Sequence, residues 1–321
     1  MLVKIIILII GFILLIKGAD FLLKGAKNFT KLTHVPELIV GILIVGIGTS
    51  LPEIILTVKS ALTGNTDLIL GNAIGSSICN FLLVLGIACV TKPIKLDLKM
   101  CEQHLVILAV SIIALGVLSN YMFNIGYLDK QEGFILLVAT CLYLIFNIKN
   151  AISKDQDKDE KENKNNKEKI TKKDVIYIIF LIVIGIIMLN YGADFVIDAS
   201  TFIAEYFKIK AEIISLTIIA VGTALPEIIT SIIGSRSHNN DLVIGNIIGS
   251  NVFNTIMLPA LGAIISPIKV GIDLNNSLLF LGLLTTGMII KYVGFGNNII
   301  TKKRGVTFII IYCLYVASLI V

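Results

Sequence analysis

Charged residues are scarce in this chain of 321 residues, because Asp, Glu, Lys and Arg together make up only 15% of it. A soluble protein typically carries about 25% charged residues, so this chain has too little polar surface to coat a water-soluble globule. Hydrophobic residues make up 56%, and the mean hydropathy is +0.92. The composition argues against a soluble enzyme and a nucleic-acid-binding protein. It predicts an all-α, polytopic membrane protein.

Cysteine and histidine are also few, with five cysteines and three histidines in the whole chain. An odd number of cysteines, most of them within apolar runs, argues against a disulfide framework. Zinc and copper favour nitrogen and sulfur ligands, and no cluster of histidines or cysteines supplies them. A metal site in this chain must therefore be built from oxygen ligands.

Long apolar stretches make up most of the chain. A bilayer core of roughly 30 Å requires about 20 apolar residues per helix, and ten stretches meet this requirement. The first has no signal-peptide cleavage site and is related to a later segment, so we expect it to be retained as a span. The ten predicted spans lie near residues 3–23, 36–60, 67–91, 104–122, 133–150, 174–197, 211–234, 241–265, 275–294 and 305–321.

One long hydrophilic segment, residues 151–173, interrupts these spans. Its mixture of Lys, Asp, Glu and Asn has no apolar periodicity, which is typical of a solvated linker. We therefore expect a first five-helix half at residues 1–150 and a second at 174–321.

The distribution of Lys and Arg predicts the orientation of the chain in the membrane, since cytoplasmic loops carry the excess of these residues. With the N-terminus outside, the inside segments hold 20 of the 27 basic residues, including eight lysines of the linker. We expect a multi-pass protein of the plasma membrane with both termini outside and the linker in the cytoplasm.

The two halves repeat each other at a constant offset of 174 residues. Gly48–Ile55 reads GTSLPEII and Gly222–Ile229 reads GTALPEII. Polar residues and prolines recur in the same register, which shared apolarity does not explain. Because each half holds five spans, the second half is predicted to lie upside down relative to the first. Inverted repeats of this kind build secondary transporters whose sites lie near the membrane midplane.

Two acidic residues, Glu53 and Glu227, fall deep in the second and seventh predicted spans. A charge at the centre of a membrane helix costs at least about 2.5–3.5 kcal/mol on insertion scales, so it usually faces a polar pathway. No Lys or Arg lies at a comparable depth to pair with either. These two carboxylates are the predicted centre of the site.

The helix around each glutamate is weakened by a proline, Pro52 or Pro226. Proline has no N–H, so a carbonyl one turn earlier loses its donor and becomes a candidate ligand. Thr49 and Ser50 precede Glu53 by four and three residues and share its face of the helix.

The third and eighth predicted spans supply complementary groups. Ser76 and Asn80 lie four residues apart on one face, as do Ser250 and Asn254. Glycines at 71, 75, 245 and 249 are expected to let the backbones of neighbouring helices approach closely. Carboxylates, amides, hydroxyls and carbonyls are hard oxygen ligands that suit Ca²⁺ and, by the same argument, Na⁺.

The charge of the site predicts the mechanism. An empty site with about two negative charges is costly to occlude, and one Ca²⁺ or two Na⁺ ions would neutralise it. Conformational switching would then require a loaded site, which favours exchange over leak.

These motifs resemble those of the cation/Ca²⁺ exchanger superfamily, specifically its prokaryotic Na⁺/Ca²⁺ exchanger branch. The similar segments are GTSLPEI at 48–54, GTALPEI at 222–228, GNAIGSSICN at 71–80 and GNIIGSNVFN at 245–254. The resemblance implies an antiporter that exchanges Ca²⁺ for Na⁺ by alternating access, with the first and sixth spans sliding across the ligand core. It implies no cofactor, no nucleic acid and no obligate protein partner, only the two transported ions and the lipid bilayer.

The resemblance also implies a ligand set centred on Glu53 and Glu227. The further ligand positions that it implies are Thr49, Ser50, Ser76, Asn80, Thr223, Ser250, Asn254 and the carbonyls of Gly46 and Ala220. Two positions depart from the family pattern. Ala224 replaces a serine that is common in the second repeat, and Asn254 stands where some microbial relatives have aspartate. Both weaken the case for three sodium ions per cycle and leave H⁺ or K⁺ participation open.

Three other functions compete with Na⁺/Ca²⁺ exchange. The main one is a Ca²⁺ antiporter driven by protons. A passive cation channel is disfavoured by the inverted repeat. An intramembrane aspartyl protease would use Asp20 and Asp194, but both follow Gly-Ala and not the Gly-x-Gly expected of such enzymes. We expect these two aspartates to be structural and the protein not to be an enzyme.

Overall fold

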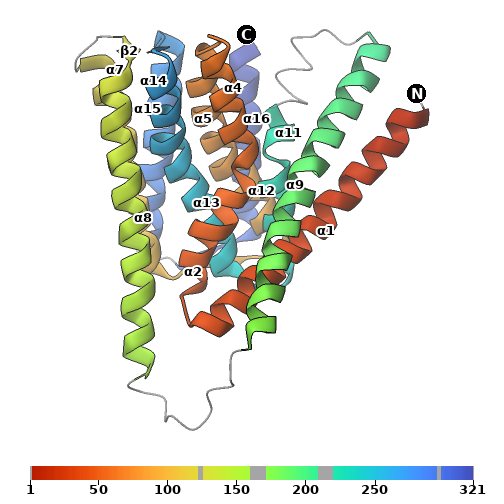
Figure 1. Ribbon diagram of the computed structural model, residues 1–321. Helices are drawn as coiled ribbons and strands as arrows, with labels where there is room; N and C mark the ends of the chain where they lie inside the picture. Colours follow the sequence, from red (N-terminus) through yellow and green to blue (C-terminus); the bar gives the residue numbers. More distant parts are fainter. Residues whose placement is uncertain (1, 122–125, 160–170, 209–219, 295–297, 321) are drawn as a thin grey trace.

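The computed structural model describes residues 2–121, 126–159, 171–208, 220–294 and 298–320. Within these ranges the chain is almost entirely helical, as its composition predicts (Figure 1). The first half contains α1 (Leu2–Thr33), α2 (Glu37–Val40), η1 (Gly41–Gly46), α3 (Ile47–Thr49), α4 (Leu51–Leu62), α5 (Asp67–Cys79), η2 (Asn80–Val84), α6 (Leu85–Thr91), α7 (Leu98–Tyr121) and α8 (Lys130–Asp159), where η marks π-helical segments. The second half contains α9 (Lys172–Tyr206), α11 (Ala220–Thr223), α12 (Leu225–Arg236), α13 (Asn240–Val252), η5 (Phe253–Met257), α14 (Leu258–Ile265), α15 (Ile272–Met288), η6 (Ile289–Gly294) and α16 (Lys302–Ile320).

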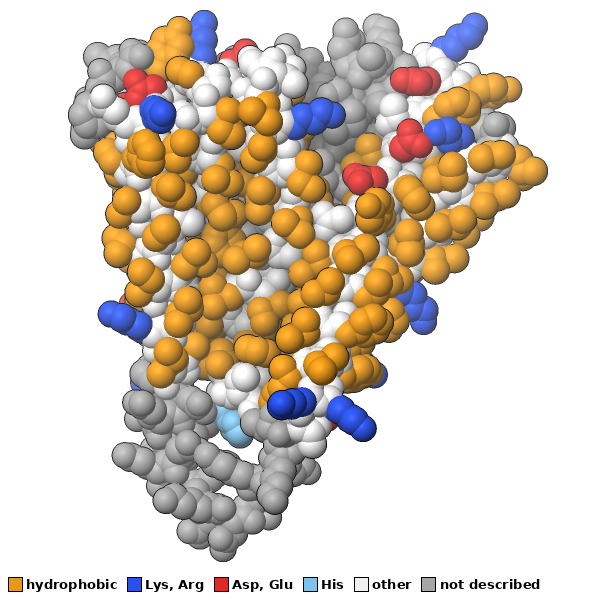
Figure 2. All heavy atoms as spheres, viewed as in Figure 1, with side chains coloured by type: hydrophobic (Ala, Val, Ile, Leu, Met, Phe, Trp, Pro, Cys, Tyr) orange, Lys and Arg blue, Asp and Glu red, His pale blue; other side chains and the backbone are white. Residues whose placement is uncertain are grey.

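Within the described ranges, six helical segments are long and apolar enough to cross a membrane, or seven if the pair bent by 48° at Ser50 counts as one span. Large apolar side chains such as Ile113 and Leu283 are exposed on the outside of the bundle. Hydrophobic side chains cover most of the face seen in Figure 2. Lysine and arginine side chains lie mainly toward the two ends of that face. The protein is therefore a multi-pass membrane protein.

The N- and C-termini lie at one end of the molecule, and the end of α8 and the start of α9 lie at the other (Figure 1). We call the first end the terminal face and the second the linker face. Helix α8 continues to Asp159, past the boundary at residue 150 expected from the sequence. Its last residues are mostly charged or polar, and Lys and Glu are good helix formers, so no residue there stops the helix.

Helices α1 and α9 cross antiparallel beside the rest of the bundle (Figure 1). Their contact is lined by glycines seven residues apart, so the two backbones approach closely. A methyl group added at Gly18 would lie only 2.8 Å from the backbone nitrogen of Leu189 and 2.9 Å from the carbonyl of Gly185. Near the terminal face, Lys4 and Asp198 form a 2.7 Å salt bridge between the same two helices.

Four short strands, two residues each, add to the helical fold predicted from the sequence. β1 (Ile94–Lys95) pairs antiparallel with β4 (Ile299–Ile300), and β2 (Tyr127–Leu128) pairs with β3 (Ile268–Lys269). Each pair joins one half of the chain to the other. The side chains of Ile94, Leu128, Ile268 and Ile300 are fully buried, so both pairs also extend the hydrophobic core.

The backbone repeats itself between the halves in its irregular features as well as in its helices. His34 and Lys208 have nearly equal positive φ angles of 56° and 58° and lie 174 residues apart in the chain. Gly64 and His238 are related by the same offset, with φ angles of 77° and 61°. Gly64 lies in the turn after α4, and His238 lies in the turn after α12. These are the two helices that carry Glu53 and Glu227.

Candidate functional site

The helix that carries Glu53 is broken where the sequence predicts weakness. Between α3 and α4, Ser50 leaves helical geometry with φ −83° and ψ 9°, and Pro52 follows as the second residue of α4. Ala224 has nearly the same conformation between α11 and α12, with φ −85° and ψ 1°. Each glutamate therefore lies in the first turn of a new helix, where the free N–H groups favour negative charge.

The carboxylates of Glu53 and Glu227 are buried, with only 2% and 1% of their residue surfaces exposed. They lie close enough to interact electrostatically, with Ser76 beside Glu53 and with Thr49 and Ser50 beside Glu227. Within the described residues the one salt bridge joins Lys4 and Asp198, so neither glutamate has a cationic partner there. The two halves thus bring two acidic groups together inside the bundle.

Several buried oxygen atoms in this region have no hydrogen-bond partner among the described residues. In a native protein almost every buried polar atom has a partner, so such a group calls for an explanation. The unpartnered atoms at predicted ligand positions are Ser50 Oγ, Glu53 Oε2, Asn80 Oδ1, Glu227 Oε1, Glu227 Oε2 and Asn254 Oδ1. They come from both halves and are all of the type that binds hard cations.

The other predicted ligands have these places. Ser76 and Ser250 are buried in α5 and α13, and the hydroxyl of Ser250 donates a 3.4 Å hydrogen bond to the carbonyl of Gly46. That carbonyl also accepts from the backbone N–H of Ser50, at 3.1 Å, so it keeps its helical donor. Thr223 is half-buried at the end of α11, and Ala220 begins the same helix, with its side chain outside the described part of the chain.

π-helical turns occur where predicted ligands lie, which the sequence did not indicate. η1 ends at Gly46, η2 begins at Asn80, and Asn254 is the second residue of η5. A π-turn inserts an extra residue into the helix and is frequently found at functional sites. At η2 and η5 the extra residue changes the direction in which the residues of the turn, Asn80 and Asn254 among them, leave the helix axis.

Asn246 and Thr230 are two further buried polar residues that the sequence reasoning did not place in the site. The hydroxyl of Thr49 donates a 3.0 Å hydrogen bond to Asn246 Oδ1, and Asn246 Nδ2 lies 3.4 Å from the hydroxyl of Thr230. The signal was present, because Asn72 recurs at Asn246 in the repeat. Its role depends on the packing of α13 against α3 and α12, which the sequence does not specify.

The predicted close approach of helices at four glycines is observed at two of them. Gly245 and Gly249 of α13 pack directly against α2 and η1. Around Gly71 and Gly75 of α5, no atom of the described chain lies within 4 Å of an added methyl group. Gly245 and Gly249 pack on α2 and η1 of the first half. The equivalent partner of Gly71 and Gly75 would be residues 215–220 of the second half, and 215–219 lie outside the described residues.

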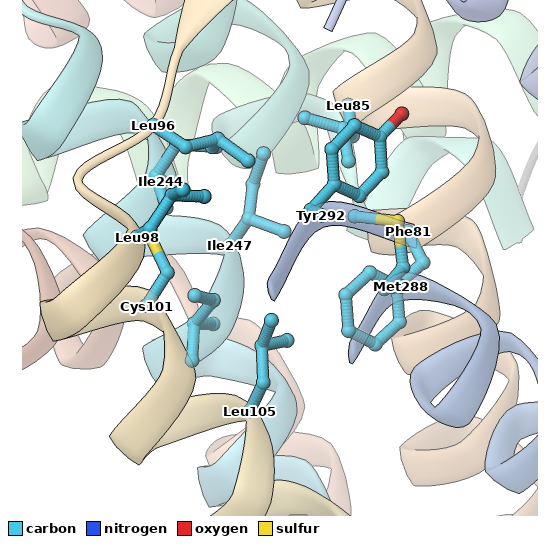
Figure 3. A pocket seen from close by; sticks show the side chains of 11 residues that line it. Phe81, Leu85, Leu96, Leu98, Cys101, Leu105, Ile244, Ile247, Met288 and Tyr292 are labelled. Atoms are coloured by element: carbon cyan, nitrogen blue, oxygen red, sulfur yellow. The ribbon is translucent and has the colours of Figure 1, made fainter. Parts of the chain in front are cut away.

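Two other features lie apart from the glutamates. An apolar cavity is lined by side chains of η2, α7, α13 and α15 such as Phe81, Leu105, Ile247 and Met288, and none of the predicted ligands lines it (Figure 3). Asp20 and Asp194 are exposed on α1 and α9. Exposed positions do not give the two closely shared carboxylates of an aspartyl protease.

Comparison with known proteins yields consistent matches over nearly the whole chain. Residues 3–149 and 177–321 match the family described as "Sodium/calcium exchanger protein". The inner membrane protein YrbG of Escherichia coli is 35% identical over 269 residues, which cover 83% of this chain and 81% of that protein. The sodium/calcium exchanger MaX1 of Methanosarcina acetivorans is 26% identical, covering 90% and 93%.

The fold matches solved structures equally well. A structure of the sodium-calcium exchanger NCX_Mj soaked with 10 mM Na⁺ and zero Ca²⁺ superposes with a TM-score of 0.84 at 26% identity, covering 99% of each chain. A second structure of that exchanger, soaked with 2.5 mM Na⁺ and 10 mM Sr²⁺, gives 0.83.

Proposed function

Since this chain belongs to the sodium/calcium exchanger protein family, we propose that it is a secondary active transporter that exchanges Ca²⁺ for Na⁺ across the membrane. Exchange takes place by alternating access at a site near the midplane, built around Glu53 and Glu227. The protein is a transporter and not an enzyme, and it uses no cofactor. Ca²⁺ and Na⁺ are its transported substrates.

The observation that carries this proposal is a set of buried oxygens around two carboxylates, none of which has a hydrogen-bond partner or a Lys or Arg partner in the part of the chain that the structure describes. Two buried negative charges without compensation are strongly unfavourable in a medium of low dielectric constant. A single Ca²⁺ or two Na⁺ ions would neutralise them and occupy the unpaired oxygens. Ca²⁺ takes six to eight oxygen ligands, which the neighbouring hydroxyls and amides can complete.

In the proposed site the two carboxylates bind the ion directly, and neutral oxygens from both halves complete the shell. In the conformation described, the Gly46 carbonyl accepts from the Ser50 N–H and from the hydroxyls of Thr49 and Ser250, so it binds an ion when the two hydroxyl bonds are released. The complete proposed ligand set is Glu53, Glu227, Thr49, Ser50, Ser76, Asn80, Thr223, Ser250, Asn254 and the carbonyls of Gly46 and Ala220.

Alternating access requires two related halves that can exchange roles. We assign ten spans to the chain, five in residues 1–150 and five in 174–321, joined by a linker at 151–173 and related as inverted repeats. The matching breaks at Ser50 and Ala224 and the antiparallel crossing of α1 and α9 support this assignment. In this arrangement α1 and α9 move across the ligand-bearing helices as a gate.

The proposed orientation places both termini outside the cell and the linker in the cytoplasm. It rests on the excess of Lys and Arg in the segments assigned to the inside. Under this orientation the linker face, where Lys27 of α1 bonds Asn239 in the turn after α12, is the cytoplasmic one.

A second candidate is a Ca²⁺ antiporter that uses H⁺ or that also requires K⁺. Ala224 offers no hydroxyl where Ser50 offers one in the other half, and Asn254 offers no charge. A 58-residue segment is 41% identical to the human sodium/potassium/calcium exchanger 2, although it covers only 18% of this chain. These features keep participation of H⁺ or K⁺ open beside the proposed Na⁺ exchange.

Uptake of ⁴⁵Ca²⁺ into proteoliposomes separates the candidates. The purified protein is reconstituted into liposomes that have an outward gradient of Na⁺, of K⁺ or of H⁺ alone. The Na⁺ gradient is tested with and without K⁺. Uptake driven by outward Na⁺ is the expected result, whereas uptake driven only by a pH gradient would replace our proposal with the proton-driven one. A requirement for K⁺ together with Na⁺ would support the K⁺-dependent form.

A further inference from the structure

Most buried hydroxyls in the described helices are bonded to their own helix. Ser77, Thr140 and Thr285 each donate to the carbonyl four residues earlier, at 2.9 Å. Such back-bonding satisfies a hydroxyl in an apolar environment. A few buried hydroxyls have no hydrogen-bond partner among the described residues, and beyond Ser50 of the proposed site the fully buried ones are Thr57, Ser231, Ser235 and Tyr292.

Two of these free hydroxyls form a row with Glu227 on α12. Ser231 and Ser235 follow Glu227 by four and eight residues, so all three lie on one face of the helix. At 1.5 Å per residue the row extends about 12 Å from the carboxylate toward the linker face. It is a file of buried oxygens that leads away from the proposed site.

Helix α1 lies across the far end of this row. Lys27 Nζ donates a 2.9 Å hydrogen bond to Asn239 Oδ1, in the turn that follows α12. One turn earlier on α1, Leu23 reaches within 3.7 Å of the position that a methyl group on Gly234 would occupy. An apolar side chain and a positive charge of α1 therefore contact α12 at Gly234, next to Ser235, and the turn that follows the helix.

The internal repeat supplies counterparts of Asn239 and Lys27, but these counterparts do not bond to each other. Asn65 and Thr201 are the repeat equivalents of Asn239 and Lys27. The turns match, because the N–H of Asn65 bonds the carbonyl of Ser60 and that of Asn239 bonds Gly234, both at 2.9 Å. Yet the side chain of Asn65 donates to Thr63, and the buried hydroxyl of Thr201 has no partner among the described residues.

We propose that the row formed by Ser231 and Ser235 is the path by which a transported cation passes between Glu227 and the linker face, and that Lys27 closes it by bonding to Asn239. The inference rests on the proposed transport function. The ammonium group of Lys27 repels cations at the mouth of the path while α1 holds it there. When α1 withdraws, the mouth opens, and the hydroxyls replace part of the water shell of a Na⁺ or Ca²⁺ ion in transit.

The matching residues at the terminal face then take the opposite role. Thr57 stands four residues after Glu53 on α4, as Ser231 does after Glu227. In the state with the linker side open, α9 closes the terminal side through Thr201 and Asn65. Among the described residues the Lys27 contact is made and its counterpart at Thr201 is not, so we assign the structure to the state closed toward the linker face.

Labelling of a cysteine at Ser235 by a membrane-impermeant thiol reagent tests the closure. The test uses Ser235→Cys in a background in which the five native cysteines are replaced by alanine, checked for folding by size-exclusion chromatography. Applied from the linker face, the reagent should react at least about five times faster when Lys27→Ala is added. The matched control is Ala61→Cys, the repeat equivalent, whose labelling from the terminal face Lys27→Ala should not accelerate. Equal labelling of the Ser235→Cys variant with and without Lys27 would overturn the proposal.

A second variant tests the opposite sign in the chain with its native cysteines. Asn239→Asp places a carboxylate against Lys27, so it should strengthen the closure and slow ⁴⁵Ca²⁺ exchange severalfold, while equilibrium Ca²⁺ binding stays unchanged. Faster exchange in this variant would contradict the closure by Lys27. The labelling assay needs no ion gradient, so a failure of Na⁺/Ca²⁺ exchange itself would not be mistaken for a failure of this inference.

Discussion

The hydroxyl of Thr49 donates a 3.0 Å hydrogen bond to the side-chain carbonyl oxygen of Asn246, across 197 residues of sequence. The bond joins the helix break beside Glu53 in the first half to α13 in the second. Both residues are fully buried or nearly so. The bond orients Thr49, a proposed ligand, through Asn246, which is not in the proposed ligand set.

Removal of this partner should weaken Ca²⁺ binding. Asn246→Ala removes the shorter of the two hydrogen bonds of the Thr49 hydroxyl and leaves only the 3.4 Å contact with the Gly46 carbonyl. A poorly satisfied buried polar group costs about 1–3 kcal/mol. We expect the Kd for Ca²⁺ to rise about tenfold, since roughly 1.4 kcal/mol corresponds to a factor of ten. Isothermal titration calorimetry on the purified protein measures it.

A matched control exists in the amide pair of Asn120 and Asn275, which exchange two hydrogen bonds of 3.0 and 2.9 Å between α7 and α15. Asn120→Ala also removes an amide contact between helices, here a partly buried one on helices that carry none of the proposed ligands. It should lower thermal stability and leave the Kd for Ca²⁺ unchanged. Equal effects of the two variants on Ca²⁺ binding would refute a positioning role for Asn246.

Restoring a hydroxyl at Ala224 should strengthen Na⁺ binding. Ala224 is buried and has almost the same backbone conformation as Ser50, so a serine there can present its oxygen from the matching break. In Ala224→Ser we expect the Na⁺ concentration that half-displaces ⁴⁵Ca²⁺ to fall a few-fold. Ser50→Ala should change it in the opposite direction. An unchanged Na⁺ dependence in both variants would remove these positions from the Na⁺ site.

The glycine contact between α1 and α9 should tolerate no larger side chain. Gly18→Val would force a side chain against the backbone of Leu189 and Gly185, and overpacking of this kind typically costs about 1–3 kcal/mol. Thermal unfolding in detergent should shift downward. Gly287→Ala is the control, because no atom of the described chain lies within 4 Å of its added methyl group. A stable Gly18→Val would contradict the close crossing.

The strand pair between β1 and β4 offers a test with neighbouring residues. Ile300 is fully buried, whereas Ile299 on the same strand is 43% exposed. Ile300→Asp buries an unpaired carboxylate, which is strongly destabilising. Ile299→Asp should leave the thermal unfolding temperature nearly unchanged. If the two variants unfold at similar temperatures, the strand pair does not join the halves in solution as described.

Much of the arrangement follows from local sequence rules. The prolines after Ser50 and Ala224 predicted weakened helices, and the structure breaks both helices at those residues. The expectation that neither glutamate pairs with a lysine or arginine agrees with the described residues. Composition alone predicted a helical membrane protein, because too few charges are available to cover a soluble surface.

Other features depend on tertiary packing and leave no clear mark in the sequence. The π-turns at Asn80 and near Asn254 have no known residue pattern, so the rotation of these side chains was not predicted. The strands are two residues long, too short for an alternating pattern. In the sequence Asn246 is one of many repeated polar residues. Its hydrogen bond with Thr49 depends on the packing of α13 against α3.

The central claim is that Glu53 and Glu227 jointly bind the transported ion, and the double variant Glu53→Gln, Glu227→Gln tests it most directly. Glutamine keeps the size and an oxygen of each side chain but removes both charges, so one Ca²⁺ would leave the site with an uncompensated double positive charge. ⁴⁵Ca²⁺ uptake into Na⁺-loaded proteoliposomes by the folded variant should fall to the level of empty liposomes. Uptake at the rate of the unmodified protein would contradict the account.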